Sequence, residues 1–205
     1  DGAAILNLTE KANEEITLYA VWELQSYTIG YIGTDFDGVI NTNKTSYTVE
    51  DGKINLMDPV RAGYTFAGWY DNESFTGEPV KVIEQGNLGD KIFYAKWEAN
   101  TRTYTVKHYL QKAEGDGYQW MATQNPKGKT DETVTPPVNT TYGDEYELPE
   151  PQTVTISAEK QTVVTYYYKR KVHKLTFEPE NGEKTQTVEG RVGATLNVKQ
   201  PVRKG

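Results

Sequence analysis

Cysteine is absent from this chain of 205 residues, and histidine and methionine occur only twice each. Without cysteine the chain has no disulfides, no zinc sites built on thiolates and no cysteine nucleophile. Long apolar runs are also missing, since no stretch approaches the roughly 18–20 residues of a transmembrane helix, and no signal-peptide pattern is present. We therefore expect no membrane insertion within this chain, and we expect export and anchoring signals to lie outside it.

Basic residues are fewer than acidic ones, and the formal net charge is −7. Binding to nucleic acid or to an anionic membrane requires a clustered basic face. The one basic cluster is Lys169-Arg170-Lys171, with His173 and Lys174 beyond it, and it falls between two repeats. We interpret this cluster as a solvated linker and expect no nucleic-acid partner.

The composition favours strands. Hydrophobic residues make up 36% of the chain, and its aromatic residues are dominated by 15 Tyr. Tyr, Thr and Val fit the half-buried, pleated surface of a sheet. The same composition predicts thin cores, and therefore several small domains in place of one thick one.

Two aromatic runs form the core of one repeat unit. Residues 63–70 (GYTFAGWY) and 91–98 (KIFYAKWE) alternate apolar or aromatic residues with smaller or polar ones. This period of two predicts a pair of half-buried strands. Between them, turn residues and one helical turn around residues 82–85 are expected. The four tryptophans, Trp22, Trp69, Trp97 and Trp120, are expected to lie in the cores.

The second run has an earlier counterpart. Residues 15–23 and 90–98 match at Tyr, Ala, Trp and Glu, and the two Trp residues, Trp22 and Trp97, are 75 positions apart. This interval exceeds the roughly 20–50 residues of solenoid repeats, so each unit is expected to be a domain with its own core. We predict that residues 1–24 end one repeat, with its last strand at residues 15–23. Residues 25–99 are predicted to be a complete copy.

The second half contains a related unit and a further copy. Residues 100–171 begin with a strand resembling the one at Tyr27 and close with Thr162–Lys169, with a proline-rich middle that suits an edge. Residues 172–205 are predicted to start another copy of the first type. Within them, residues 201–205 (PVRKG) resemble residues 59–63 (PVRAG).

These motifs carry a family resemblance. Residues 63–70, followed by residues 92–97 (IFYAKW), resemble the internalin B-repeat, or Listeria–Bacteroides repeat. Residues 104–169, with HYLQ near the start and VVTYYY at the end, are similar to the mucin-binding-protein (MucBP) type of repeat. Both resemblances imply an α+β, strand-dominated fold of tandem small β-grasp, ubiquitin-like domains.

The resemblance also implies a function. It predicts non-enzymatic, extracellular modules of a bacterial cell-surface protein that serve as a stalk or spacer and in adhesion. One alternative is a genuine adhesin domain that recognises host glycan (mucin), glycoprotein or matrix protein. A second is a set of accessory repeats in a surface hydrolase.

Candidate sites are few. We expect no catalytic residue, cofactor or metal ligand, because His108 and His173 look like ordinary sheet positions and the Asp–Gly turns lack the further ligands of a calcium loop. Consecutive strand residues point to opposite faces, so at least one tyrosine of the Tyr166-Tyr167-Tyr168 run must be exposed. Tyr166 and Tyr168 are therefore named as candidate ligand-binding residues.

Overall fold

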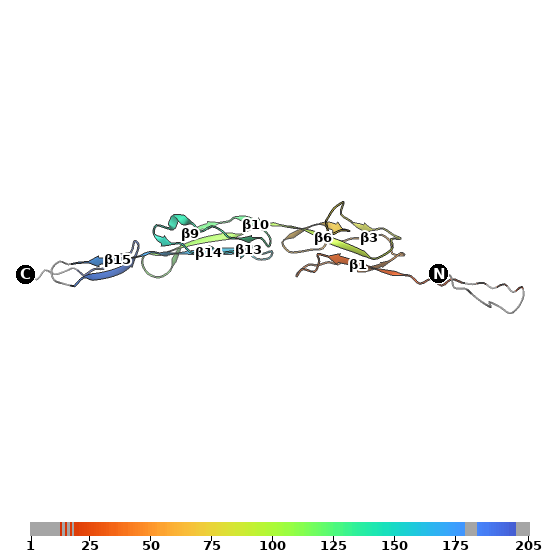
Figure 1. Ribbon diagram of the computed structural model, residues 1–205, viewed down its shortest axis with the longest axis horizontal. Helices are drawn as coiled ribbons and strands as arrows, with labels where there is room; N and C mark the ends of the chain where they lie inside the picture. Colours follow the sequence, from red (N-terminus) through yellow and green to blue (C-terminus); the bar gives the residue numbers. More distant parts are fainter. Residues whose placement is uncertain (1–12, 14, 16, 18, 179–183, 200–205) are drawn as a thin grey trace, which may run out of the picture. The chain divides into compact units, whose positions relative to one another are not determined.

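The structure is a computed structural model that describes residues 13, 15, 17, 19–178 and 184–199. Its contacts group into two compact units. The first holds the described residues up to Ile32 with Thr42–Met57 and Trp69–Tyr94; the second holds Gly33–Asn41, Asp58–Gly68 and the described residues from Ala95 onward. In the part of the chain that is described, the only helix is one 3₁₀ turn, η1 (Thr140–Tyr142), so the expected strand-dominated class is confirmed (Figure 1).

The first repeat is built on a four-stranded sheet. Its strands are β1 (Ser26–Ile32), β2 (Ser46–Thr48), β4 (Tyr64–Tyr70) and β6 (Lys91–Ala99), in the order β2-β1-β6-β4. β1 runs antiparallel to β2 and parallel to β6. A second, two-stranded antiparallel sheet pairs β3 (Ile54–Asn55) with β5 (Val82–Ile83). The helical turn expected at residues 82–85 was thus wrong, because Val82 and Ile83 pair with β3.

The following repeat has a second four-stranded sheet. Its strands are β8 (Thr105–Gln111), β9 (Tyr118–Gln124), β12 (Tyr146–Glu147) and β14 (Val163–Arg170), in the order β12-β14-β8-β9. β8 runs antiparallel to β9 and parallel to β14, and β12 runs antiparallel to β14. Two small antiparallel sheets accompany it: β7 (Thr101–Thr103) with β10 (Lys127–Lys129), and β11 (Thr133–Val134) with β13 (Val154–Thr155).

Both repeats have the same connectivity despite their different sequences. In each, the first long strand pairs antiparallel with the second and parallel with the last, and the last strand also borders a strand from the middle of the repeat. A parallel pair cannot be closed by a tight hairpin, so the middle of each repeat must cross from one side of the sheet to the other. The two four-stranded sheets therefore share one strand order, although the sequence motifs of the two repeats differ.

The segments at either end hold less structure. β15 (Val172–Phe177) pairs antiparallel with β16 (Gln186–Arg191), and every residue of β15 is exposed. The strand expected at residues 15–23 is not found in their described part, where Trp22 is 89% exposed. Its counterpart Trp97, by contrast, donates from Nε1 to the Gly33 carbonyl at 2.8 Å and packs against Phe66. Among the described residues Trp22 has no such partner to hold it in a sheet.

The cores are small and aromatic. Trp69, Ile29, Tyr47 and Phe93 are buried in the first repeat, and Trp69 Nε1 donates to the Met57 carbonyl at 3.0 Å. In the following repeat the largest buried cluster contains Tyr104, Val106, Tyr146, Ile156, Val164, Tyr166 and Tyr168. Large aromatic side chains each remove about 150–250 Å² from water, which is how so thin a core stabilises a sheet.

Trp120 departs from the expected core position. It is 58% exposed. A register shift between His108 and Tyr109 places Ala122 opposite His108 but Trp120 opposite Tyr109, so that Met121 is an extra residue in β9. Such a bulge changes which face the following side chains occupy. The prediction that Trp120 lies in the core was wrong because sequence alternation alone does not show the bulge.

No helix in the described part of the chain has the length and apolar character needed to cross a membrane.

Candidate functional site

The tyrosine run of β14 alternates as a strand must, with its two candidate binding residues on the inner face. Tyr166 and Tyr168 are fully buried, and Tyr167 is 51% exposed. The hydroxyl of Tyr166 donates to the Pro136 carbonyl at 2.6 Å, and the hydroxyl of Tyr168 accepts from the Asn139 backbone N–H at 2.9 Å. Tyr166 and Tyr168 are therefore structural. The exposed residue of the run, which a surface ligand can reach, is Tyr167.

His108 occupies the same core. It is fully buried on β8, its Nδ1 lies 2.9 Å from the Tyr168 hydroxyl, and its ring stacks on Tyr166. Since the Tyr168 oxygen already accepts from Asn139, its hydrogen is free to be donated to Nδ1, which leaves the ring proton on Nε2. That Nε2 has no hydrogen-bond partner among the described residues. Burial lowers the pKa of His108, so the imidazole is neutral and acts as a core residue.

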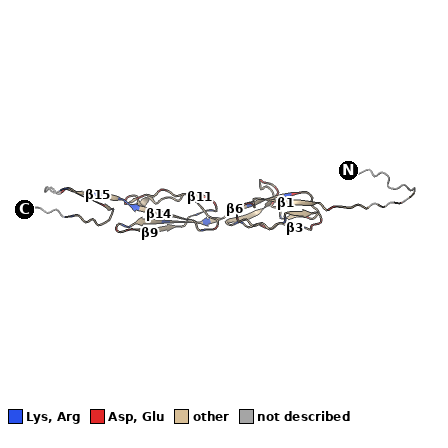
Figure 2. Cartoon of the chain, turned by 90° about the horizontal axis from the view of Figure 1, so that it is seen from below, with Lys and Arg blue, Asp and Glu red and all other residues tan. Residues whose placement is uncertain are grey.

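The outer face of this sheet carries a row of aromatic side chains. Tyr167, Tyr109 and Trp120 lie opposite one another across β14, β8 and β9. Tyr109 stacks on Tyr167 with ring centroids 5.4 Å apart, and Tyr118 meets Tyr167 edge-on at 4.9 Å. We call these four residues the aromatic row. Neither Asp nor Glu occurs in β8, β9 or β14, although the chain is acidic overall (Figure 2).

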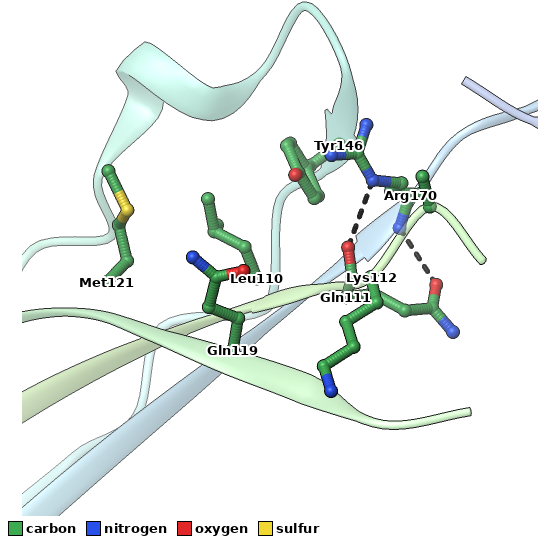
Figure 3. Close-up of a pocket in the computed structure, with 8 residues that line it drawn as sticks. Leu110, Gln111, Lys112, Gln119, Met121, Tyr146 and Arg170 are labelled. Carbon is green, nitrogen blue, oxygen red and sulfur yellow. Dashed lines mark hydrogen bonds between the residues drawn. The ribbon is translucent and has the colours of Figure 1, made fainter. Parts of the chain in front are cut away.

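The opposite side of the same sheet borders a pocket, at the end of the sheet where β8 and β14 finish. The pocket has a volume of about 200 Å³. Figure 3 shows residues that line it, with Arg170 and Tyr146 on one side and Leu110, Gln119 and Met121 on the other. Its full lining is Leu110, Gln111, Lys112, Ala113, Gln119, Met121, Tyr146 and Arg170. Two of these residues are basic and none is acidic.

Several hydrogen bonds hold the Arg170 side chain in place beside this pocket. Its side chain is only 17% exposed. Nε donates to the Gln111 carbonyl at 3.0 Å, Nη1 donates to Glu145 and to the Val192 carbonyl, and Cζ lies 4.7 Å from the centre of the Tyr146 ring. The interpretation of the Lys169–Lys171 cluster as a solvated linker was therefore wrong for Arg170. A basic run gives no sequence signal of the carbonyl groups that meet it in the fold.

A third cluster lies around Asn100 within the second compact unit, and sequence reasoning missed it. The chain passes from β6 to β7 through Asn100 alone. The Asn100 N–H donates to the Gly63 carbonyl at 2.9 Å, and the Asn100 carbonyl accepts from the Thr130 N–H at 3.0 Å. The Asn100 side-chain oxygen accepts from Thr65 Oγ1 at 2.6 Å. These hydrogen bonds thus connect Asn100 to Gly63, Thr65 and Thr130.

Side chains extend the same contact. The Tyr64 hydroxyl donates to Asp131 Oδ2 at 2.6 Å. Arg61 stacks over the rings of Phe36 and Tyr64, with Cζ 4.0 and 3.7 Å from their centres, and its Nη2 lies 4.0 Å from Asp131 Oδ2. We refer to Arg61, Gly63, Tyr64, Asn100, Thr130 and Asp131 as the joint. Its residues come from turns and strand ends, so no periodic pattern predicts it.

Within the described residues, no group of three His, Asp or Glu side chains is placed to hold a metal ion. The clusters described above are an aromatic face, a small basic pocket and the joint. None of them places a nucleophile beside a general base.

Comparison with known proteins gives matches to parts of this chain. Residues 27–96 match the family model of the Listeria-Bacteroides repeat domain. A stretch of 89 residues is 35% identical to Internalin H of Listeria monocytogenes, covering 42% of this chain and 15% of that protein.

Two proteins of Evansella cellulosilytica are also similar. One, named as a membrane protein, is 33% identical over 105 residues, covering 49% of this chain and 14% of that protein. The other, named as a Gly-rich membrane protein, is 31% identical over 100 residues, covering 48% of this chain and 11% of that protein.

The matched segments are thus a minor part of each relative, at most 15% of its length. The MucBP-type resemblance of residues 104–169 stays a prediction. Residues 27–96 are therefore similar to a repeat of the Listeria–Bacteroides type, and part of the chain is similar to an internalin.

Proposed function

We propose that these repeats are non-enzymatic spacer modules of an extracellular protein on a bacterial cell surface. The match of residues 27–96 to the Listeria-Bacteroides repeat and the similarity to Internalin H support a surface-protein context. The shared strand order of the two sheets, each with a parallel central pair, supports tandem β-grasp domains.

The joint is the observation that carries the spacer function. A spacer has to transmit position from one module to the next, and a flexible linker does this poorly because its end-to-end distance fluctuates. Here a single residue, Asn100, separates β6 from β7, and its backbone hydrogen-bonds to Gly63 and to Thr130. Tyr64, Arg61 and Asp131 add a hydrogen bond, ring stacking and a charge pair to this contact.

A replacement experiment tests this proposal. Residues 25–171 are exchanged, in the protein that carries them, for a Gly/Ser linker of equal length or for two unrelated, rigidly joined domains. If the repeats are a spacer, the part of the protein beyond them should stand closer to the cell surface when the flexible linker replaces them. Its distance from the surface should be restored by the two unrelated domains. Loss of function with both replacements would contradict the spacer role.

The aromatic row favours adhesion as a second function. Exposed Tyr and Trp faces bury large area at low entropic cost and dominate many recognition surfaces. Tyr167 and Trp120 are both more than half exposed, and the strands β8, β9 and β14 that carry this aromatic row contain no acidic residue. We expect saturable binding of the whole chain to an immobilised host glycan or matrix protein. It should be lost in Tyr167→Ala and kept in Phe75→Ala, a control at an exposed aromatic residue of the other repeat. Equal loss in both variants, or no binding by the wild type at physiological salt, would contradict this function.

A further inference from the structure

The Arg170 pocket has the features of a binding site for a small ligand. We infer that it binds the carboxylate of a compact hydroxylated acid, of the sugar-acid class, with Tyr146 and Arg170 as its donors. This inference does not depend on the spacer function, because the pocket lies within the second repeat, away from the joint.

Tyr146 is the observation that points to a ligand. Its side chain belongs to the core and the residue is only 6% exposed. It also lines the pocket, and its hydroxyl, which makes no hydrogen bond to a described residue, is open to solvent there, since His108 Nε2 is the one fully buried side-chain atom without a partner among the described residues. Tyrosine hydroxyls usually have a partner when the ring is buried. Here the open position beside that hydroxyl is the pocket.

Arg170 adds charged donors next to this hydroxyl. Its backbone N and its Nε are bonded to Gln111, and its Nη1 is bonded to Glu145 and Val192. These bonds hold the guanidinium in place, and they leave the Nη2 group without a partner among the described residues. Cζ lies 4.7 Å from the centre of the Tyr146 ring, so the guanidinium stacks over that ring, and both residues line the pocket.

The charge of the pocket selects an anion. Arg170 and Lys112 line it and no acidic residue does. Glu145 neutralises one side of the guanidinium at 3.1 Å, but this carboxylate is mostly exposed and does not line the pocket. A planar carboxylate suits the fork of an arginine, and hydrogen bonds between charged partners are about twice as strong as neutral ones.

The size and remaining walls restrict the rest of the ligand. A volume of about 200 Å³ is below the roughly 300–1,000 Å³ of drug-sized sites, so the ligand is about one ring in size. Leu110 and Met121 provide an apolar wall, while the amides of Gln111 and Gln119 offer donors and acceptors suited to hydroxyl groups. A hydroxylated ring with one carboxylate fits this combination.

The two methionines of the chain make a direct test feasible. Met121 lines the pocket and Met57 lies outside it. The whole chain, labelled with ¹³C at the methionine methyl groups, is titrated with glucuronate and, separately, with glucose. We expect a saturable shift of the Met121 signal with glucuronate alone, while the Met57 signal stays in place.

Substitutions then identify the donors. Tyr146→Phe keeps the buried ring and removes only the hydroxyl, so it should weaken glucuronate binding about 3- to 10-fold, as expected for one lost hydrogen bond. Tyr118→Phe, on the outer face of the sheet, should leave the affinity unchanged. An unmoved Met121 signal, equal shifts at Met57, equal affinity for glucose, or unchanged affinity in Tyr146→Phe would each overturn the proposal. Binding of peptide carboxylates without sugar acids would overturn the ligand class.

Discussion

The hydroxyl of Tyr64, at the start of β4, donates a 2.6 Å hydrogen bond to the carboxylate of Asp131 in the next repeat. This hydrogen bond, together with burial, raises the pKa of Tyr64 above its ordinary value, and the nearby Arg61 opposes the rise. The two residues are far apart in sequence, so the bond links two distant segments of the second compact unit.

The Tyr64–Asp131 bond predicts a pH dependence at the alkaline end. Because the pKa of Tyr64 is raised in the folded state, the bond contributes its full share of the unfolding free energy below about pH 10, the ordinary tyrosine value. That contribution is lost as the pH rises through the folded pKa. Phenolate absorbance, compared between the wild type and Tyr64→Phe, isolates the Tyr64 titration. Asp131→Asn should move that titration to lower pH. An identical titration in Asp131→Asn would show that the bond does not form.

Gly63 predicts a steric requirement at the joint. It has a φ of +75°, and a Cβ there would lie 2.7 Å from Thr130 and 2.8 Å from Ala158. Gly77 is a matched control, because it has a φ of +82° and open space around the same position. Both Gly→Ala variants carry the cost of a left-handed alanine, about 1–2 kcal/mol. Gly63→Ala should lose more stability than Gly77→Ala in denaturant unfolding; equal losses would mean that the contact is not tight.

The tyrosine run predicts opposite results at adjacent residues. Tyr166→Phe removes a hydroxyl that donates to the Pro136 carbonyl and accepts from the Gln152 N–H, at 2.6 and 3.1 Å. Leaving the buried Pro136 carbonyl unpaired should cost about 1–3 kcal/mol of unfolding free energy. Tyr167→Phe, at an exposed position, should stay within about 0.5 kcal/mol of the wild type. The reverse order in thermal or denaturant unfolding would contradict the assignment of faces.

His108 predicts a loss of stability in mild acid. Because burial lowers its folded pKa below the ordinary 6.5, the unfolded chain binds a proton more readily in the window between the two values. The stabilisation is fully present above about pH 6.5 and falls as the pH drops through the folded pKa. The groups that face the ring are Tyr166 and Tyr168.

Two variants test the His108 prediction. His108→Asn can still accept from the Tyr168 hydroxyl but does not titrate, so its stability should change less with pH in that window. His173→Asn, at an exposed residue of β15, should keep the wild-type dependence. If the unfolding free energy of His108→Asn changed with pH as steeply as that of the wild type, another group would be the cause of the pH dependence.

Sequence patterns located the strands better than they located the faces. The runs at residues 63–70 and 91–98 correspond closely to β4 and β6, because a period of two is a direct consequence of the pleat. The same alternation shows that Tyr166 and Tyr167 face opposite sides, but not which side is covered. That depends on the crossing segment, which binds Tyr166 through Pro136 and Gln152.

The joint and the pocket were beyond sequence reasoning for a similar reason. Both are made of residues from turns and strand ends, brought together by strand order and register. Arg170 is one of three consecutive basic residues in sequence, and the carbonyls of Gln111 and Val192 that accept from its side chain come from distant segments. Trp120 was misplaced by one extra residue, Met121, in β9.

The most direct test of the spacer account is a distance distribution across the joint. The chain has no cysteine, so Asp37→Cys and Lys160→Cys place two nitroxide labels at exposed positions, one in each repeat, without background labelling. Pulsed electron paramagnetic resonance should give one narrow distribution, which broadens when Tyr64→Phe and Asp131→Asn are added. A broad distribution in the otherwise wild-type chain would show that the repeats move freely and would contradict the account.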